Sequence, residues 1–384
     1  MISLQSERKA TPLLFFPVFF ICWSLVLGIT PTASLAADTF PLYPCLKANV
    51  KFWEDVYSRY STRQGVVHDM EDLRRVYAVI DLVDWEAPDA AKINSERIKA
   101  AKDRIDGILA SLGSGTPPRT AEERRIGGLF PSQRQASYQE ARDNIRLQIG
   151  QSDRFYEGLI RSGKYLPQFR QIFLSQGLPA ELAYLPHVES SFNPKAYSKA
   201  GAAGLWQFTR STGKEYLTIN QQVDERYDPY IATQAAAQLL KGNYEQLQSW
   251  PLALTAYNHG RAGMMRAARE MGNYENIFKF YNKGSFKFAS RNFYSEFLAA
   301  MRVAMRMGSN PKIPFERPEA TVTVQLKEDM PISRLRSSFR ISSDHFARLN
   351  PALLPSVLEG EKAVPQGYLV RLPSAQQGKA RFVR

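Results

Sequence analysis

The chain has 384 residues, of which 44% are hydrophobic and 23% are charged, and its formal net charge is +13. This length allows about two or three domains with hydrophobic cores, and this composition argues against a wholly disordered chain. The basic charge favours an acidic polymer or an anionic membrane surface as a partner.

Residues 1–36 have the pattern of a secretory signal peptide. The basic pair Arg8-Lys9 precedes an apolar run over 13–27, and the small residues in 34–36 suit a cleavage site. We therefore expect the protein to be exported to the periplasm or cell envelope. An uncleaved signal-anchor is the alternative.

The two cysteines predict neither a lipid anchor nor a disulfide. Cys22 follows Ile21 rather than the small residue that a lipoprotein cleavage site needs. Removal of the signal peptide would leave Cys45 alone, so no intramolecular disulfide could form, and we expect an inert buried thiol.

Export of a basic protein points to the cell wall, with peripheral membrane or wall association. It argues against nucleic acid, and the sequence has neither a lysine-rich run nor a spacing typical of zinc sites. No metal or other cofactor is expected, and the oligomeric state stays open.

Residues 37–140 are predicted to form a helical accessory region. A break over 113–118, rich in glycine and proline, divides it. His68-Asp69 could be a ligand or catalytic pair, but without a third partner nearby we interpret it as a surface hydrogen bond. Two apolar stripes support the helices, namely Phe52, Val56, Tyr57 and Tyr60, and Ile98, Ile105, Leu109 and Leu112.

Residues 141–310 are predicted to form a helical domain. Asp228-Pro229 and Trp250-Pro251 each have the pattern of a helix start. The acidic residues Asp224, Glu225 and Asp228 are interpreted mainly as caps and ion-pair partners rather than as a catalytic carboxylate. Apolar positions along its first helices are Ile145, Phe155, Leu159, Phe169 and Ile172.

Glu189 is the strongest candidate for catalysis. Leu178, Leu182 and Leu185 have the spacing of a helical apolar stripe, and Glu189 is its next position. An ionised carboxylate is costly on an apolar face, so Glu189 should keep its proton to a higher pH and could protonate a leaving oxygen. Pro186 should kink this helix, and a solvated or capping glutamate is the alternative.

Two ordered motifs give this carboxylate a context. Glu189-Ser190-x-Phe192-Asn193-Pro194 is followed by Ser198 and by Gly201-Ala202-Ala203-Gly204-Leu205-Trp206-Gln207, and Ala256-Tyr257-Asn258-His259-Gly260 comes later. Together they resemble the soluble-lytic-transglycosylase (SLT) domain of the lysozyme superfamily over about residues 140–310. The sequence Gly-Leu-Trp-Gln-Phe is similar to that found in the D type of the membrane-bound lytic murein transglycosylases.

The resemblance implies roles for other residues. Ser198 and Gln207 would hydrogen-bond the acetamido group or sugar hydroxyls, and Tyr257 and Asn258 would line the cleft. The family has a Glu-Thr-Arg-x-Tyr element where this chain has Ala289-Ser290-Arg291-Asn292-Phe293. Either the register differs by one, which makes Tyr294 a substrate-binding candidate, or that hydroxyl is absent.

Residues 321–373 are predicted to form a small separate module. Alternation in 322–326 and 368–372 indicates strands, and 332–339 and 344–350 are helical stretches. This βααβ order resembles a lysin-motif (LysM) glycan-binding module, although Lys327-Glu328-Asp329-Met330 stands where such modules carry Gly-Asp-Thr. A purely structural appendage is the alternative.

The predicted fold is therefore mainly α, with a lysozyme-like SLT domain, an N-terminal helical region and a LysM-like module. The resemblance implies a peptidoglycan lytic transglycosylase that cleaves between N-acetylmuramic acid and N-acetylglucosamine and leaves 1,6-anhydromuramic acid ends. Glu189 would act as acid and then as base. A lysozyme-like hydrolase and a non-catalytic wall-binding protein are the alternatives.

Overall fold

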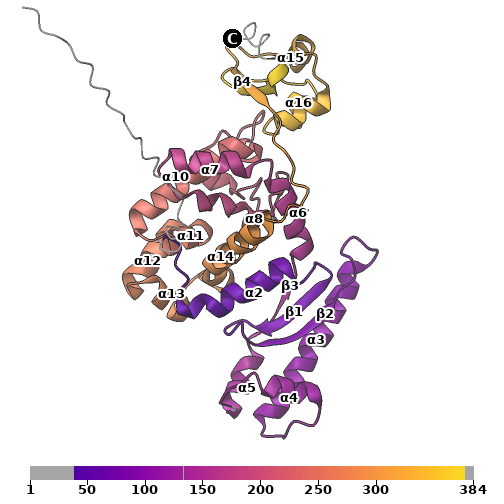
Figure 1. Cartoon of the computed structure of the whole chain (residues 1–384), viewed down its shortest axis with the longest axis vertical. Coiled ribbons are helices and arrows are strands. Elements are labelled where there is room, and N and C mark those ends of the chain that lie inside the picture. Colours follow the sequence, from indigo (N-terminus) through magenta and orange to yellow (C-terminus); the bar gives the residue numbers. More distant parts are fainter. Residues whose placement is uncertain (1–38, 133, 377–384) are drawn as a thin grey trace, which may run out of the picture.

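The computed structural model describes residues 39–132 and 134–376, which form three lobes along one axis (Figure 1). We call them the sheet lobe (64–149), the helical body (40–58 and 152–315) and the C-terminal module (321–373). Helices dominate the described chain, which confirms the expectation of a mainly α protein. The expected signal peptide lies outside the described residues.

The sheet lobe corrects the prediction of a purely helical N-terminal region. Its central strand β1 (Gln64–Asp69) pairs antiparallel with β2 (Val76–Asp81) and with β3 (Ile145–Ile149). The β-branched and aromatic residues of these segments favour strands, and the short turn between β1 and β2 favours a hairpin. Ile145, which was assigned to a helix, begins β3.

Three helices complete the sheet lobe. They are α3 (Ala90–Gly113), α4 (Ala121–Gly127) and α5 (Gln135–Arg142). They cover the sheet and share one core with it, which includes Val67, Tyr77, Ile105, Leu109 and Phe130.

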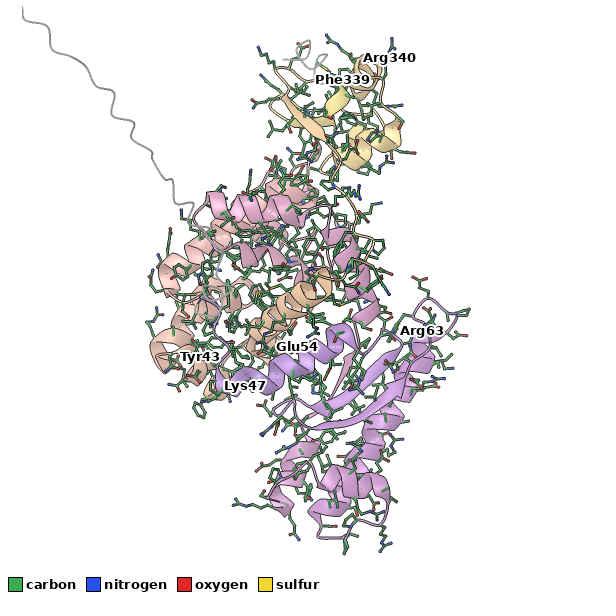
Figure 2. The ribbon with its side chains drawn as sticks, in the orientation of Figure 1. Tyr43, Lys47, Glu54, Arg63, Phe339 and Arg340 are labelled. Carbon is green, nitrogen blue, oxygen red and sulfur yellow. The ribbon has the colours of Figure 1, made fainter. Side chains whose placement is uncertain are left out.

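Helix α2 (Lys47–Ser58) comes before the sheet lobe in sequence but packs in the helical body. It lies along α14 (Phe288–Gly308), and its apolar face is buried in the core of the body. Figure 2 shows Glu54 on α2, and its carboxylate lies 3.6 Å from the guanidinium of Arg302 on α14.

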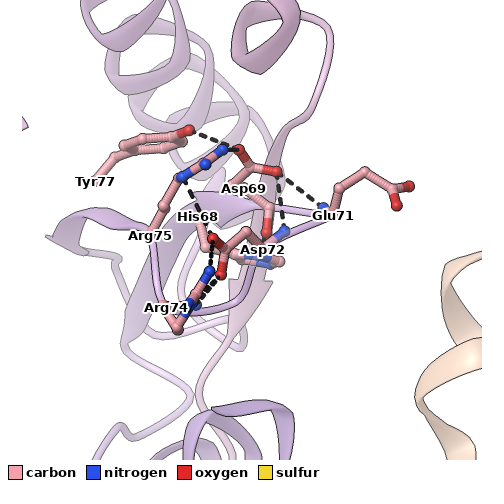
Figure 3. A network of polar contacts seen from close by, with 7 residues as sticks. All are labelled: His68, Asp69, Glu71, Asp72, Arg74, Arg75 and Tyr77. Carbon is pink, nitrogen blue, oxygen red and sulfur yellow. Dashed lines mark hydrogen bonds and ion pairs between the residues drawn. The ribbon is translucent and has the colours of Figure 1, made fainter. Parts of the chain in front are cut away.

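His68 and Asp69 form a buried junction rather than the surface pair that we predicted (Figure 3). The Asp69 carboxylate accepts hydrogen bonds from Arg75 and from the Tyr77 hydroxyl, both at 3.0 Å. The His68 ring packs against Phe52 of α2 at 4.7 Å and against Phe288 of α14. Arg75 and Tyr77 supply the hydrogen bonds that the buried carboxylate of Asp69 needs. The packing of the His68 ring on α2 and α14 stabilises the joint between the sheet lobe and the body.

The helical body surrounds α14. The two predicted helix starts are confirmed: Asp228 caps α10 by accepting hydrogen bonds from Tyr230 N and Ile231 N, and α11 begins at Trp250. The remaining elements are η1 (Pro44–Leu46), α6 (Ser152–Ser162), α7 (Leu166–Ser175), η2 (Ala180–Tyr184), α8 (Pro186–Glu189), α9 (Arg210–Gly213), η3 (Glu225–Tyr227), α10 (Pro229–Leu247), α11 (Trp250–His259), α12 (Arg261–Met271) and α13 (Tyr274–Phe280).

The C-terminal module contains the expected strands and helices and one additional short helix. Strands β4 (Thr321–Gln325) and β5 (Leu369–Pro373) pair antiparallel. Between them lie α15 (Ile332–Phe339), α16 (Ser343–Leu349) and α17 (Pro355–Leu358), and η4 (Ser374–Gln376) follows β5.

The module is fastened to the loop before α10 and to the start of α10. Asp224 N donates to Ala352 O at 2.8 Å, and Leu354 N donates to Gln222 O at 2.9 Å. Arg371 of β5 pairs with Asp228 at 3.0 Å and lies over the ring of Tyr230. These contacts fix the module beside the first turn of α10.

Cys45 is half-buried, and its thiol lies 3.6 Å from the Glu275 carboxylate. Burial raises the pKa of this thiol, and Glu275 raises it further, so the thiolate is disfavoured. Within the described ranges, no helix has the length and apolar character needed to cross a membrane.

Candidate active site

Glu189 is the last residue of α8, a single helical turn. We expected a kinked helix through Leu178, but the structure has the 3₁₀ turn η2 followed by a new helix that begins at Pro186. Proline is tolerated at the first helical position because its missing N–H would have no partner there. The proline therefore starts the turn that carries Glu189.

The turn is held by the ring of His187, which is buried. This ring lies 4.8 Å from Phe155 and 4.5 Å from Phe192. Burial lowers the pKa of His187 to about 3, so the imidazole is neutral and serves as a packing group. Among the described residues, no group of three potential ligands could hold a metal ion.

Glu189 opens into a cavity of about 670 Å³. The cavity lies between the helical body and the sheet lobe, so residues far apart in sequence form its walls. They are Trp53 and Tyr57 of α2, Arg146 and Gln148 of β3, Arg154, Glu157 and Arg161 of α6, and Phe288, Ala289 and Glu296 of α14.

The environment of Glu189 favours a protonated carboxyl. The residue is half-buried in the cavity wall, and no described residue hydrogen-bonds its carboxyl oxygens. Burial, together with the neighbouring Glu296, raises the pKa of Glu189 to about 8. At neutral pH the group can therefore donate a proton.

Glu296 is a second carboxyl in this cavity, and sequence reasoning missed it. It lies two helical turns after Ala289 on the same face of α14, and burial raises its pKa well above the ordinary value. The available signal was one acidic residue within the apolar run from Phe293 to Leu298.

The three acidic residues that we considered as a second catalytic carboxylate have other roles, as we expected. Asp224 pairs with Arg226 at 2.7 Å. The Glu225 carboxylate accepts a hydrogen bond from Thr218 N at 2.6 Å. Asp228 caps α10 and pairs with Arg371.

The predicted substrate-binding residues differ in how they are placed relative to Glu189. Tyr257 lies near it: burial raises the pKa of Tyr257, the charge of Glu189 raises it further, and its hydroxyl donates to Trp206 O at 2.7 Å. Tyr257 is not among the residues that line the cavity, and neither are Ser198, Gln207 and Asn258. These last three shape the loops around it instead.

Each of these three side chains forms a hydrogen bond with another residue of the protein. The Gln207 amide donates to Gly204 O at 2.9 Å, and its backbone has a φ of 48°. Ser198 Oγ accepts from Ala202 N at 3.0 Å. Asn258 is exposed, and its Oδ1 accepts from the Ser290 hydroxyl at 2.9 Å.

Tyr294 is not part of the site, which corrects the prediction that it binds substrate. Its side chain is fully buried, and its hydroxyl donates to Pro41 O at 3.0 Å. Phe293 is also buried, so neither residue of this pair presents a hydroxyl to the cavity. The helical face that reaches the cavity is that of Ala289 and Glu296.

Comparison with known proteins identifies a domain that contains Glu189. Residues 175–278 match the family model "Transglycosylase SLT domain", so the chain carries this domain, as the motifs indicated. The matched segment contains Glu189, Gln207 and Tyr257.

The curated relatives that match part of the chain include two lytic murein transglycosylases. Membrane-bound lytic murein transglycosylase D of Escherichia coli (strain K12) is 31% identical over 143 residues, which cover 33% of this chain and 32% of the relative. Membrane-bound lytic murein transglycosylase F 2 of Alkalilimnicola ehrlichii is 32% identical over 123 residues, or 29% and 26% of the two chains. The match to transglycosylase D thus spans about a third of that relative's length.

Proposed function

We propose that this protein, which carries a transglycosylase SLT domain, is a lytic transglycosylase of peptidoglycan. The observation that carries the proposal is Glu189, which lies in the SLT segment and opens into the cavity. Its carboxyl has no hydrogen-bond partner among the described residues, and burial raises its pKa. The names of the relatives support peptidoglycan as the substrate class.

In the proposed reaction, Glu189 first acts as an acid. It donates its proton to the glycosidic oxygen between N-acetylmuramic acid and N-acetylglucosamine, and the C–O bond to the leaving sugar breaks. The 2-acetamido group of the substrate stabilises the positive charge that develops at the anomeric carbon.

Glu189 then acts as a base. The 6-hydroxyl of the same muramic acid forms the new C–O bond to the anomeric carbon, and Glu189, now a carboxylate, takes its proton. No water is consumed, and the enzyme regains its starting protonation state. Tethering of the attacking hydroxyl favours this step through its effective concentration.

We also propose that Ser198, Gln207, Tyr257 and Asn258 bind the sugars. Unused hydrogen-bonding groups support this role. In the described part of the chain, the Ser198 hydroxyl proton, Gln207 Oε1 and Asn258 Nδ2 have no partner, because the contacts of these side chains use their other atoms. The charge of Glu189 raises the pKa of Tyr257, which supports a place for this side chain close to the acid.

A lysozyme-like hydrolase is the second candidate, and Glu296 is the observation that favours it. A second carboxyl in the same cavity could hold a water molecule for attack on the anomeric carbon. Digestion of purified peptidoglycan tests both candidates, since each predicts soluble fragments. A protein that binds wall and releases none would contradict both.

The C-terminal module is proposed to be a LysM-like unit that retains the enzyme on the wall, in an exported protein of the periplasm or cell envelope. A cavity of about 770 Å³ lies between module and body, and Tyr227, Lys195 and Arg348 are among its walls. Aromatic and cationic side chains suit sugar rings and the carboxylates of stem peptides.

Truncation after Arg317 tests this role of the module. The cut keeps Ile313 and Phe315, which pack on the body, and removes a unit with its own core. We expect unchanged cleavage of soluble glycan fragments and weaker pelleting with insoluble wall. Circular dichroism checks that the body stays folded. Equal pelleting of both forms would assign the module a purely structural role.

A further inference from the structure

The loop that follows Glu189 has a strained backbone. Ser191 and Phe192 have φ values of 48° and 52°, in the left-handed region that residues other than glycine rarely adopt. In the part of the chain that the structure describes, they are the one consecutive pair of such non-glycine residues. Phe192 N donates to Pro186 O at 3.0 Å, so this conformation folds the chain back over the single turn that carries Glu189.

Arg161 of α6 binds both carbonyl groups of this strained pair. Its Nη2 donates to Ser191 O at 2.9 Å, and its Nε donates to Phe192 O at 3.2 Å. Among the described residues, no other group donates to these two oxygens. A strained backbone persists only where the surrounding structure fixes it, and the planar guanidinium fixes two adjacent carbonyl groups at once.

Gly158 of α6 brings the helix close enough for these contacts. A Cβ at Gly158 would lie 2.5 Å from Ser191 O, so a residue with a side chain would push the helix and the loop apart. On the same helix, the Phe155 ring lies 4.8 Å from the His187 ring of α8. Because Phe155, Gly158 and Arg161 are each three residues apart, one face of α6 lies against both the catalytic turn and the loop after it.

We propose that Arg161 and Gly158 are positioning residues for the acid Glu189. Gly158 lets α6 approach the loop, and Arg161 holds the strained backbone that follows the acid. The Glu189 carboxyl has no hydrogen bond to a described residue, so its direction depends on the backbone that carries it. The inference rests on the proposed function, because it concerns how the acid is directed at the glycosidic oxygen.

The first test is the steady-state kinetics of Arg161→Met and Gly158→Ala in the full chain, on soluble glycan fragments. A misplacement of about 1 Å can cost about 10²-fold in rate, so kcat should fall by this order. KM should stay within a few-fold of wild type, because the proposed sugar-binding residues are unchanged. Arg161 also lines the cavity, so a raised KM with unchanged kcat in Arg161→Met would overturn the inference and make it a group that binds substrate.

Each variant has a matched control in the sheet lobe. Arg125 likewise donates to the backbone oxygens of two consecutive residues, Val76 and Tyr77. Gly107 lies within α3, where a Cβ would meet nothing within 4 Å. Arg125→Met and Gly107→Ala should therefore keep kcat within a few-fold of wild type. An equal loss of kcat in Arg125→Met and Arg161→Met would overturn the inference, because the effect would then not depend on the loop after the acid.

Chemical rescue separates positioning from a general loss of structure. In Arg161→Ala, ethylguanidinium at a non-denaturing concentration should restore part of kcat, because it can bind both carbonyl groups in the half-buried place of the lost side chain. Ethylammonium carries the same charge without the planar fork of donors, so it should restore much less. Equal rescue by the two cations would overturn the inference.

Hydrogen exchange of the Phe192 amide, followed by NMR, gives a readout that needs no substrate. Phe192 is buried and its amide donates to Pro186 O, so this amide should be protected in wild type and in Arg125→Met. It should exchange faster in Arg161→Met, and unchanged protection there would overturn the inference. A protein whose exchange behaves as expected but which cleaves no peptidoglycan would contradict the proposed function alone.

Discussion

Replacing Glu189 with glutamine should lower the rate of peptidoglycan cleavage by about 10²–10⁴-fold, the usual effect of removing a positioned acid or base. The loss could only be larger here, because one carboxyl serves both steps. Glutamine keeps the shape of the side chain, so the variant should still bind insoluble wall and protect it from fresh enzyme. Release of soluble fragments measures the rate.

Glu225→Gln is the matched control. Glu225 accepts a hydrogen bond from Thr218 N and lies outside the cavity, so its variant should keep a rate within a few-fold of wild type. A Glu189→Gln variant that retains more than about a tenth of the wild-type rate would contradict the assignment. Glu296 would then be the carboxyl to test.

The Glu189→Gln variant should be more stable than wild type at neutral and alkaline pH. In the unfolded chain Glu189 ionises near its ordinary pKa, whereas burial in the folded protein raises that pKa to about 8. The folded state therefore binds the extra proton, and wild-type stability falls as pH rises between these values. At about 1.4 kcal/mol per pKa unit, and with partial solvation, Glu189→Gln should gain roughly 1–4 kcal/mol at pH 8.

This gain separates catalysis from folding. The difference between variant and wild type in free energy of unfolding should shrink as pH falls toward 4.5. A variant that is inactive because it misfolds would be less stable than wild type at every pH. Urea unfolding at several pH values makes the comparison.

Gly204→Ala should destabilise the protein by roughly 3–5 kcal/mol, among the largest effects of a single methyl group. Gly204 has a φ of +74°, and a Cβ there would lie 1.9 Å from the backbone oxygen of Arg226. Arg226 cannot move away easily, because it is buried and pairs with Asp224. Activity should fall as well, since Gly204 holds the turn that carries Gln207.

Gly272→Ala is the control for backbone strain. Gly272 has a φ of +80°, but a Cβ there would meet nothing within 4 Å. Its variant should lose only about 1–2 kcal/mol, the cost of a left-handed conformation. Equal losses in the two variants, measured by urea unfolding, would show that strain alone accounts for the effect at Gly204.

Local patterns were enough to predict several parts of this structure. Asp228-Pro229 and Trp250-Pro251 predicted helix starts because capping and proline preference depend only on neighbouring residues. Alternation at Val322 and Val370 predicted the strands of the C-terminal module for the same reason. Glu189 was selected by the motifs that resemble the SLT domain, since the apolar spacing alone also fits a solvated or capping glutamate.

Features that depend on contacts between distant segments could not be predicted. The cavity joins Arg146, Glu189 and Glu296, and no spacing in the sequence indicates that β3 lies beside α14. Tyr294 was a candidate only by its position after Phe293, and its burial depends on a contact with Pro41 far away in sequence. The helical prediction for the sheet lobe failed because β1 gains its stability from pairing with β3.

The most direct test of the proposed reaction is the mass of the cleavage products formed in ¹⁸O-labelled water. A lytic transglycosylase joins the muramic acid to its own 6-hydroxyl, so its muropeptides should end in 1,6-anhydro-N-acetylmuramic acid, lighter by one water than hydrolysis products. These ends should carry no label and should not react with borohydride. Labelled, reducible ends as the main product would contradict the proposal and identify a hydrolase.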